Sequence, residues 1–143
     1  MKIESFELDH TKVVAPYVRK AGLYRGEKGD VITKFDLRLM QPNKQELPTA
    51  AIHTLEHLLA GYLREEVEGI IDLSPMGCRT GFYLSIWGDR NEAELKDALV
   101  SSLEKVVETT EVPAVNEFQC GNYRDHSLFS AAEYAKNVVQ RLK

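Results

Sequence analysis

The chain has 143 residues, 43% of them hydrophobic, which is enough to build an apolar core, and we expect one domain over residues 1–143. Its 18 basic and 22 acidic residues give a net charge of −4 without a long basic run, which argues against a nucleic-acid partner. No stretch of about 18 apolar residues occurs and the start is charged, so we expect a cytoplasmic protein that does not enter a membrane.

Three segments have the composition and alternation of strands: residues 31–40, 70–73 and 82–87. In the first, Phe35 and Leu37 should face the core, while Arg38 should project from the opposite face or into a site. The second and third are joined by the turn-rich run SPMGCRTG, which contains Cys78.

Three other segments predict helices: residues 49–66, 91–109 and 129–142. Thr49, directly after Pro48, is the candidate N-cap of the first helix. Cys120 lies in an irregular segment between the second and third helices. Strands mixed with helices, without regular βαβ alternation, predict an α+β fold with helices on one face of a mostly antiparallel sheet.

The run HTLEH lies inside the first helix and is the strongest local signal. At about 100° per residue, His53, Glu56 and His57 share one arc of the helix, opposite its apolar face. Histidines at i and i+4 can converge on one metal ion, and Glu56 would then be placed to move protons beside it. The alternative is that the three residues are only the solvated face of an amphipathic helix.

Two cysteines, Cys78 and Cys120, could each supply a third metal ligand, and the residues alone do not assign the two roles. Two other functions are compatible with HTLEH. A small metallopeptidase of the inverted HxxEH type would use Glu56 to activate water. A non-catalytic metal-binding domain would have four ligands, with Cys78 as the extra one.

Five motifs occur in order along the chain: ESFELDHTKVVAPYVR, KFDLRLMQPNKQ, HTLEH, DLSPMGCRTGFY and QCGNYRDH. Together they resemble the S-ribosylhomocysteine lyase family, also called autoinducer-2 synthases. The resemblance implies that the thioether of S-ribosylhomocysteine is cleaved to homocysteine and 4,5-dihydroxy-2,3-pentanedione, the autoinducer-2 precursor used in quorum sensing.

The same resemblance implies roles for ten residues. His53, His57 and Cys120 would bind one divalent ion per subunit, Fe²⁺ in the native enzyme with Zn²⁺ or Co²⁺ as substitutes, while Cys78 and Glu56 would be the acid/base pair. The implied substrate contacts are Ser5, His10 and Arg38 for the ribose, and Asp72 and Gly121 near the homocysteine. The family further implies a homodimer with its active sites at the subunit interface.

Overall fold

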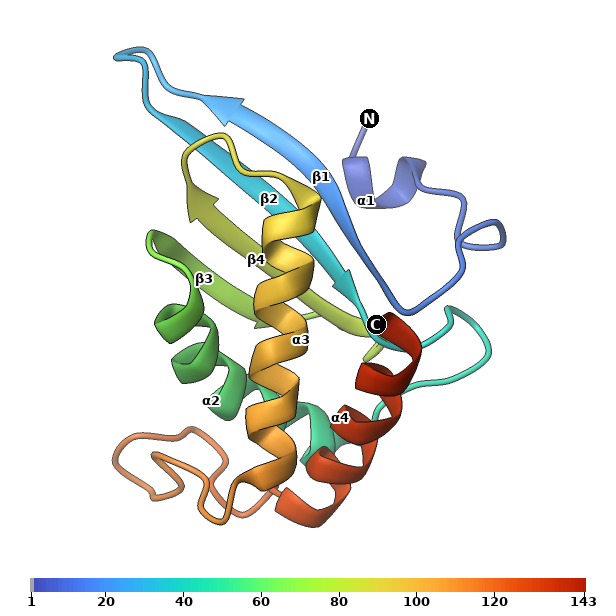
Figure 1. Ribbon diagram of the computed structural model, residues 1–143, viewed down its shortest axis with the longest axis vertical. Coiled ribbons are helices and arrows are strands. Elements are labelled where there is room, and N and C mark those ends of the chain that lie inside the picture. Colours follow the sequence, from blue (N-terminus) through green and yellow to red (C-terminus); the bar gives the residue numbers. More distant parts are fainter. Residues whose placement is uncertain (1) are drawn as a thin grey trace.

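The computed structural model describes residues 2–143, which form one antiparallel sheet and four helices (Figure 1). The sheet order is β1-β2-β4-β3, and its strands are β1 (Tyr17–Arg25), β2 (Val31–Arg38), β3 (Ile70–Pro75) and β4 (Gly81–Trp87). The helices are α1 (Glu4–Glu7), α2 (Thr49–Glu66), α3 (Glu92–Glu108) and α4 (Leu128–Leu142). The α+β fold expected from the sequence is therefore confirmed.

The three long helices pack together and cover one face of the sheet (Figure 1). Helix α2 contacts β3, and α3 contacts β1, so the hydrophobic core lies between the helices and the sheet. Phe35 and Leu37 of β2 point into this core and are fully buried, as the alternation predicts. The side of α2 that carries Leu55 and Leu59 closes the core from the other side.

The other face of β2 carries Asp36 and Arg38, as expected, but both side chains are buried. Neighbouring side chains of β1 cover them, and the short helix α1 adds Glu4, which pairs with Arg19. This face of the sheet is therefore a buried polar layer. None of the helices in the described part of the chain is long and apolar enough to cross a membrane.

Two elements, α1 and β1, were not predicted from the sequence. Helix α1 is a single turn, too short to show a helical period. Strand β1 lies at the edge of the sheet, is only partly buried, and is interrupted by a bulge between Lys20 and Gly22, so its alternation is broken.

The prediction that Thr49 caps α2 is wrong. Thr49 is the first helical residue, and Pro48 holds the cap position without a side-chain hydrogen bond. Proline fixes a φ that suits the start of a helix. The Thr49 hydroxyl is instead free to donate to the carboxylate of Asp125 at 3.2 Å, which ties the start of α2 to the segment before α4.

Candidate active site

Helix α2 brings His53 and His57 to one point, because residues four apart lie one turn apart on the same face. Their Nε2 atoms lie 3.4 and 3.7 Å from the Sγ atom of Cys120, which comes from the segment between α3 and α4. Two imidazole nitrogens and a thiol at these separations match the donor set of a divalent transition metal. The three residues that the sequence proposed as metal ligands are therefore brought together.

The segment before α4 holds Cys120 through local turns. The Asn116 side chain accepts hydrogen bonds from the backbone N–H groups of Phe118 and Gln119, both at 3.0 Å. The N–H of Cys120 then donates to the Asn116 carbonyl, also at 3.0 Å. Such Asx-type turns fix a loop without a regular element, so the thiol is presented to α2 by backbone geometry.

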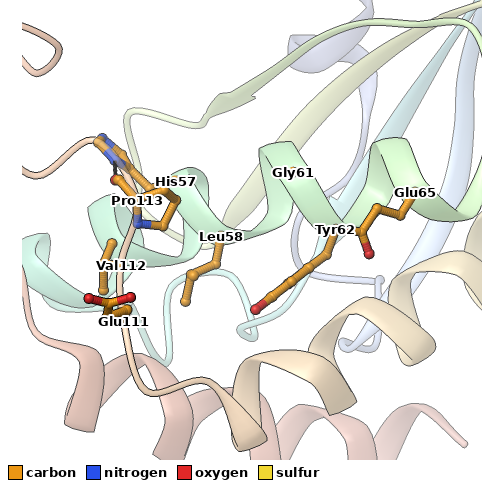
Figure 2. A pocket seen from close by; sticks show the side chains of 8 residues that line it. All are labelled: His57, Leu58, Gly61, Tyr62, Glu65, Glu111, Val112 and Pro113. Atoms are coloured by element: carbon orange, nitrogen blue, oxygen red, sulfur yellow. Dashed lines mark hydrogen bonds between the residues drawn. The ribbon is translucent and has the colours of Figure 1, made fainter.

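The imidazoles of His53 and His57 are each oriented by a backbone carbonyl. The Nδ1–H of His53 donates to the Asp125 carbonyl at 2.9 Å, and the Nδ1–H of His57 donates to the Pro113 carbonyl at 2.8 Å (Figure 2). A carbonyl can only accept, so the Nδ1 atom of each ring carries the proton and Nε2 keeps its lone pair. Both rings are thus preset in the tautomer that binds a metal through Nε2.

A fourth side chain, His126, lies beside these three and was not singled out from the sequence. We call the four candidate ligand residues, His53, His57, Cys120 and His126, the metal cluster. The Nε2 atom of His126 lies 3.7 Å from Cys120 Sγ, and the four donor atoms lie within 4.8 Å of one another. Burial lowers the pKa of His126 below its usual value, and the neighbouring His53 and His57 act in the same direction. The sequence feature that could have pointed to His126 is its position, six residues after Cys120 and just before the last helix.

Glu56 lies beside the metal cluster at a pocket of about 410 Å³, which we call the Glu56 pocket. Its lining includes His57 and Arg64 of α2, Asp72 of β3, and Ala114. The structure therefore places Glu56 and Asp72 on the same pocket as one of the proposed ligands. Gly121 directly follows Cys120 and is exposed.

Cys78 lies in a different pocket, of about 260 Å³, which we call the Cys78 pocket. His10 and Arg38 line it together with Cys78 and Thr80. The turn that presents Cys78 is tight: Arg79 has a φ of 61°, and a Cβ atom on Gly81 would lie 2.1 Å from the Leu37 carbonyl oxygen. Only glycine allows β4 to approach β2 this closely.

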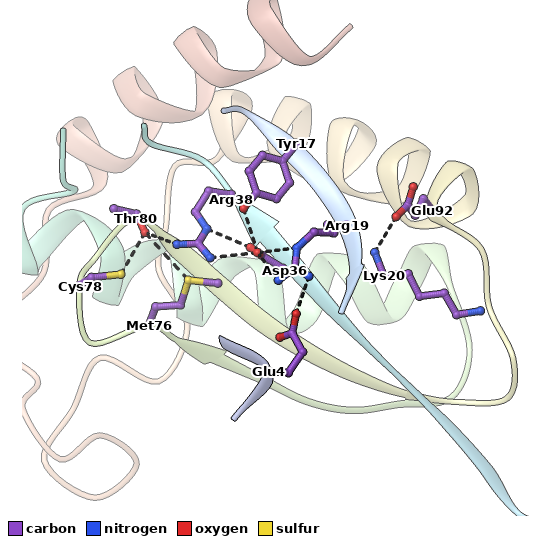
Figure 3. Close-up of polar contacts among 10 residues, drawn as sticks. All are labelled: Glu4, Tyr17, Arg19, Lys20, Asp36, Arg38, Met76, Cys78, Thr80 and Glu92. Carbon is purple, nitrogen blue, oxygen red and sulfur yellow. Dashed lines mark hydrogen bonds and ion pairs between the residues drawn. The ribbon is translucent and has the colours of Figure 1, made fainter. Parts of the chain in front are cut away.

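Arg38 is held in the Cys78 pocket by a network centred on Asp36 (Figure 3). The Asp36 carboxylate accepts from Arg38 and Arg19, and from the Tyr17 hydroxyl at 2.9 Å. Burial, and then the Asp36 charge, raise the pKa of Tyr17 to about 12. Burial disfavours the charged guanidinium of Arg38, but the hydrogen bonds and charge of Asp36 outweigh it and raise the pKa of Arg38. Arg38 is therefore a fixed cation.

The two pockets share no lining residue, so a single chain shows the proposed site in two separate parts. Within the described chain Cys78 does not lie in the metal cluster, whose fourth member is His126 and not the Cys78 of the four-ligand alternative. Ser5, on α1, is partly buried but lies on neither pocket.

Comparisons with known proteins find similarity over almost the whole chain. A family model described as S-ribosylhomocysteinase (LuxS) matches residues 3–143. The S-ribosylhomocysteine lyase of Clostridium botulinum is 67% identical over 140 residues, covering 98% of this chain and 93% of the relative. The proteins of the same name from Clostridioides difficile and Enterococcus faecalis are 59% and 58% identical, again over 98% of this chain and over 93% and 91% of their own lengths.

Proposed function

The chain belongs to the S-ribosylhomocysteinase family, and we propose on this premise that it is a carbon–sulfur lyase that cleaves the thioether of S-ribosylhomocysteine. The products are homocysteine and 4,5-dihydroxy-2,3-pentanedione, the precursor of autoinducer-2. The observation that carries the proposal is the family match over residues 3–143. The metal cluster, built from α2 and the segment before α4, supports it.

The reaction requires the carbonyl group of the sugar to move. A carbon next to a thioether is not acidic, and homocysteine can leave from C5 only when a carbonyl at C3 makes the C4 proton acidic. The opened sugar carries its carbonyl at C1, so two successive tautomerisations must move it to C2 and then to C3. Each of these steps takes a proton from one atom and returns one to another, which requires positioned acid/base groups.

We propose that His53, His57 and Cys120 hold one divalent ion per subunit, since they are the three ligands typical of a catalytic site with an open position. When bound, such an ion supplies a Lewis acid that stabilises negative charge on a carbonyl oxygen. The His₂Cys set accepts Fe²⁺, Zn²⁺ and Co²⁺, and we propose Fe²⁺ as the native ion.

Cys78 and Glu56 are the proposed acid/base residues. Cys78 is exposed at its pocket beside Arg38 and His10, and it would transfer the protons of the tautomerisation steps. Glu56, beside His57, would move protons next to the metal cluster and remove the C4 proton that starts the elimination. The carbon atoms that exchange protons lie along the sugar chain, so two acid/base groups at different positions can serve proton transfers that are out of reach of a single group.

The substrate contacts follow the same division. We propose that Arg38 and His10, with Ser5, bind the ribose, and that Asp72 and Gly121 lie near the homocysteine. Because the Cys78 pocket and the Glu56 pocket are separate within one chain, we propose that they meet across the interface of a homodimer. We place the enzyme in the cytoplasm, a reducing compartment that suits free cysteines.

The test is a free-thiol assay on the metal-loaded protein with S-ribosylhomocysteine as substrate. S-adenosylhomocysteine is the matched control, because it has the same thioether but its C1 is locked in a glycosidic bond and cannot open to an aldehyde. We expect thiol release from the first compound only, and none from the Cys78→Ala variant with its metal retained. Absence of thiol release by the metal-loaded wild type would refute the function, and turnover by Cys78→Ala would refute the role of Cys78.

A further inference from the structure

The metal cluster contains one more nitrogen donor than an open catalytic site needs. If His126 were a fourth ligand, the site would be closed in the manner of a structural zinc site. Resting on the function proposed above, we infer instead that His126 is a positioning residue: its Nε2–H donates a hydrogen bond to the thiolate of Cys120, and Thr54 fixes the tautomer that makes this donation.

The inference begins with the hydroxyl of Thr54, on the buried side of α2. Thr54 is fully buried, and its Oγ1 accepts a hydrogen bond from the backbone N–H of Ser127 at 3.0 Å. The same Oγ1 lies 2.9 Å from His126 Nδ1. Over residues 2–143, His126 Nδ1 is the one acceptor hydrogen-bonded to the Thr54 hydroxyl.

Leaving a buried hydroxyl proton without an acceptor is unfavourable, so the Thr54 O–H donates to His126 Nδ1. A neutral imidazole carries a single proton, which must then be on Nε2. A protonated nitrogen has no lone pair for a metal. His126 is thus preset in the opposite tautomer to His53 and His57, whose Nδ1–H groups donate to carbonyls.

The ring geometry adds to this assignment. A metal-bound imidazole keeps the ion close to the plane of its ring, so two ligand rings must have planes that meet near the ion. The rings of His53 and His57 are nearly perpendicular, at 81°, and so are those of His57 and His126, at 76°. The rings of His53 and His126 are stacked, with centroids 3.9 Å apart and planes only 28° from parallel, so this pair is poorly placed to bind one ion together. Of the two, His53 is the ring whose Nδ1–H donates to a carbonyl and leaves Nε2 free for a metal.

The remaining partner for His126 Nε2–H is the sulfur of Cys120, at 3.7 Å. A hydrogen bond to a metal-bound thiolate draws electron density away from the sulfur and so tunes the ion through its ligand. It also holds the thiolate in position without taking a coordination site. His126 therefore keeps the fourth position open for the oxygen atoms of the sugar.

The tautomers are read directly by long-range ¹H–¹⁵N correlation NMR of the zinc-loaded protein, in which the four histidines are assigned by single His→Gln variants. We expect His126 to carry its proton on Nε2, and His53 and His57 to carry theirs on Nδ1 with Nε2 shifted by the metal. Zinc X-ray absorption should show two imidazoles, one sulfur and one oxygen. A third imidazole, or a His126 protonated on Nδ1, would overturn the inference.

Matched variants distinguish a hydrogen bond from His126 to the Cys120 sulfur from a purely packing role of the His126 ring. In the Co²⁺ form, His126→Phe should bind one ion per chain roughly 10- to 100-fold more weakly, the usual cost of losing such a partner, with the thiolate-to-cobalt band at lower energy. His126→Gln, which keeps an N–H donor, should move the band back toward the wild type. Thr54→Val should reproduce the spectral change and Thr54→Ser should not, with circular dichroism confirming that each variant is folded.

An unchanged band in His126→Phe would contradict the inference even if its affinity fell. The tautomer of His126 is also measured in the metal-free protein, where Thr54 alone should fix it on Nε2. Failure of the wild type to bind a metal would therefore count against the proposed function, whereas an Nδ1–H tautomer in either form would count against this inference.

Discussion

Thr80 connects the buried cation Arg38 to the thiol of Cys78. Arg38 Nη1 donates to Thr80 Oγ1 at 3.0 Å, which leaves the Thr80 hydroxyl proton for another acceptor. Cys78 Sγ lies 3.0 Å from the same oxygen, whereas Met76 Sδ is 4.0 Å away. A Cys78 thiolate can only accept a hydrogen bond, so in that form the Thr80 O–H would donate to it (Figure 3).

We predict that Thr80→Val lowers kcat about 10- to 100-fold, because a hydrogen bond to a charged group contributes about 1.5–3 kcal/mol and 1.4 kcal/mol is tenfold in rate. Thr80→Ser keeps the hydroxyl and should retain most of the activity. Metal content, measured by atomic emission, should be the same in both variants. A kcat for Thr80→Val equal to that of the wild type would exclude this role.

Asp36 is the centre of the buried polar layer, and its loss should affect stability. We predict that Asp36→Asn lowers the free energy of unfolding by about 3–5 kcal/mol, because Arg38 would remain as a buried cation without its counter-ion. The matched control is Asp89→Asn, which breaks the exposed pair with Lys20 and should lower the free energy of unfolding far less. Urea unfolding of the two variants checks the difference, and equal losses would show that burial is not the cause.

At the scale of elements, helix α2 packs into the core with one side and carries two histidines of the metal cluster on the opposite side. One side packs Leu55 and Leu59 into the core, and the other carries His53 and His57 at a spacing of one turn. This division was predictable, because the helical period is visible in the sequence. Strand β1 was not predictable, because its edge position and its bulge remove the periodic signal.

We predict that His57→Ala fails to retain a metal ion through purification, since it removes one of the three proposed ligands. His10→Ala, which removes a histidine of the Cys78 pocket, should keep one ion per chain. Metal analysis of the two purified proteins is the measurement. Full occupancy of His57→Ala would show that α2 does not hold the ion through this residue.

At the scale of the whole molecule, Cys78 lines one pocket of the chain, while Glu56, and His57 of the metal cluster, line another. A site that needs both is complete only if a second copy supplies the missing half. Two aromatic side chains are strongly exposed: Phe6 on α1, at 79%, and Phe118, two residues before Cys120, at 91%. Such side chains are often covered by a partner subunit.

We predict that co-expressed Cys78→Ala and His57→Ala chains regain activity that neither variant has alone. Random pairing puts half of the dimers in the mixed form, and each mixed dimer has one intact site of two, so about a quarter of wild-type activity should return. Cys78→Ala with Arg38→Ala is the control, because both changes lie in the same pocket and no intact site can form. Equal activities of the two mixtures would exclude sites shared between subunits.

The sequence by itself determined the α+β class, most of the strands and helices, and the HTLEH face of α2, because these depend on local periodicity. It also pointed to both cysteines, although only the resemblance distinguished their roles. The tertiary structure decided what depends on contacts between distant segments: the approach of Cys120 to α2, the burial of Asp36 with Arg38, and the place of His126. A hydrogen bond between Thr54 and His126, 72 residues apart, has no local signal, since it exists only when α2 and the start of α4 are packed together.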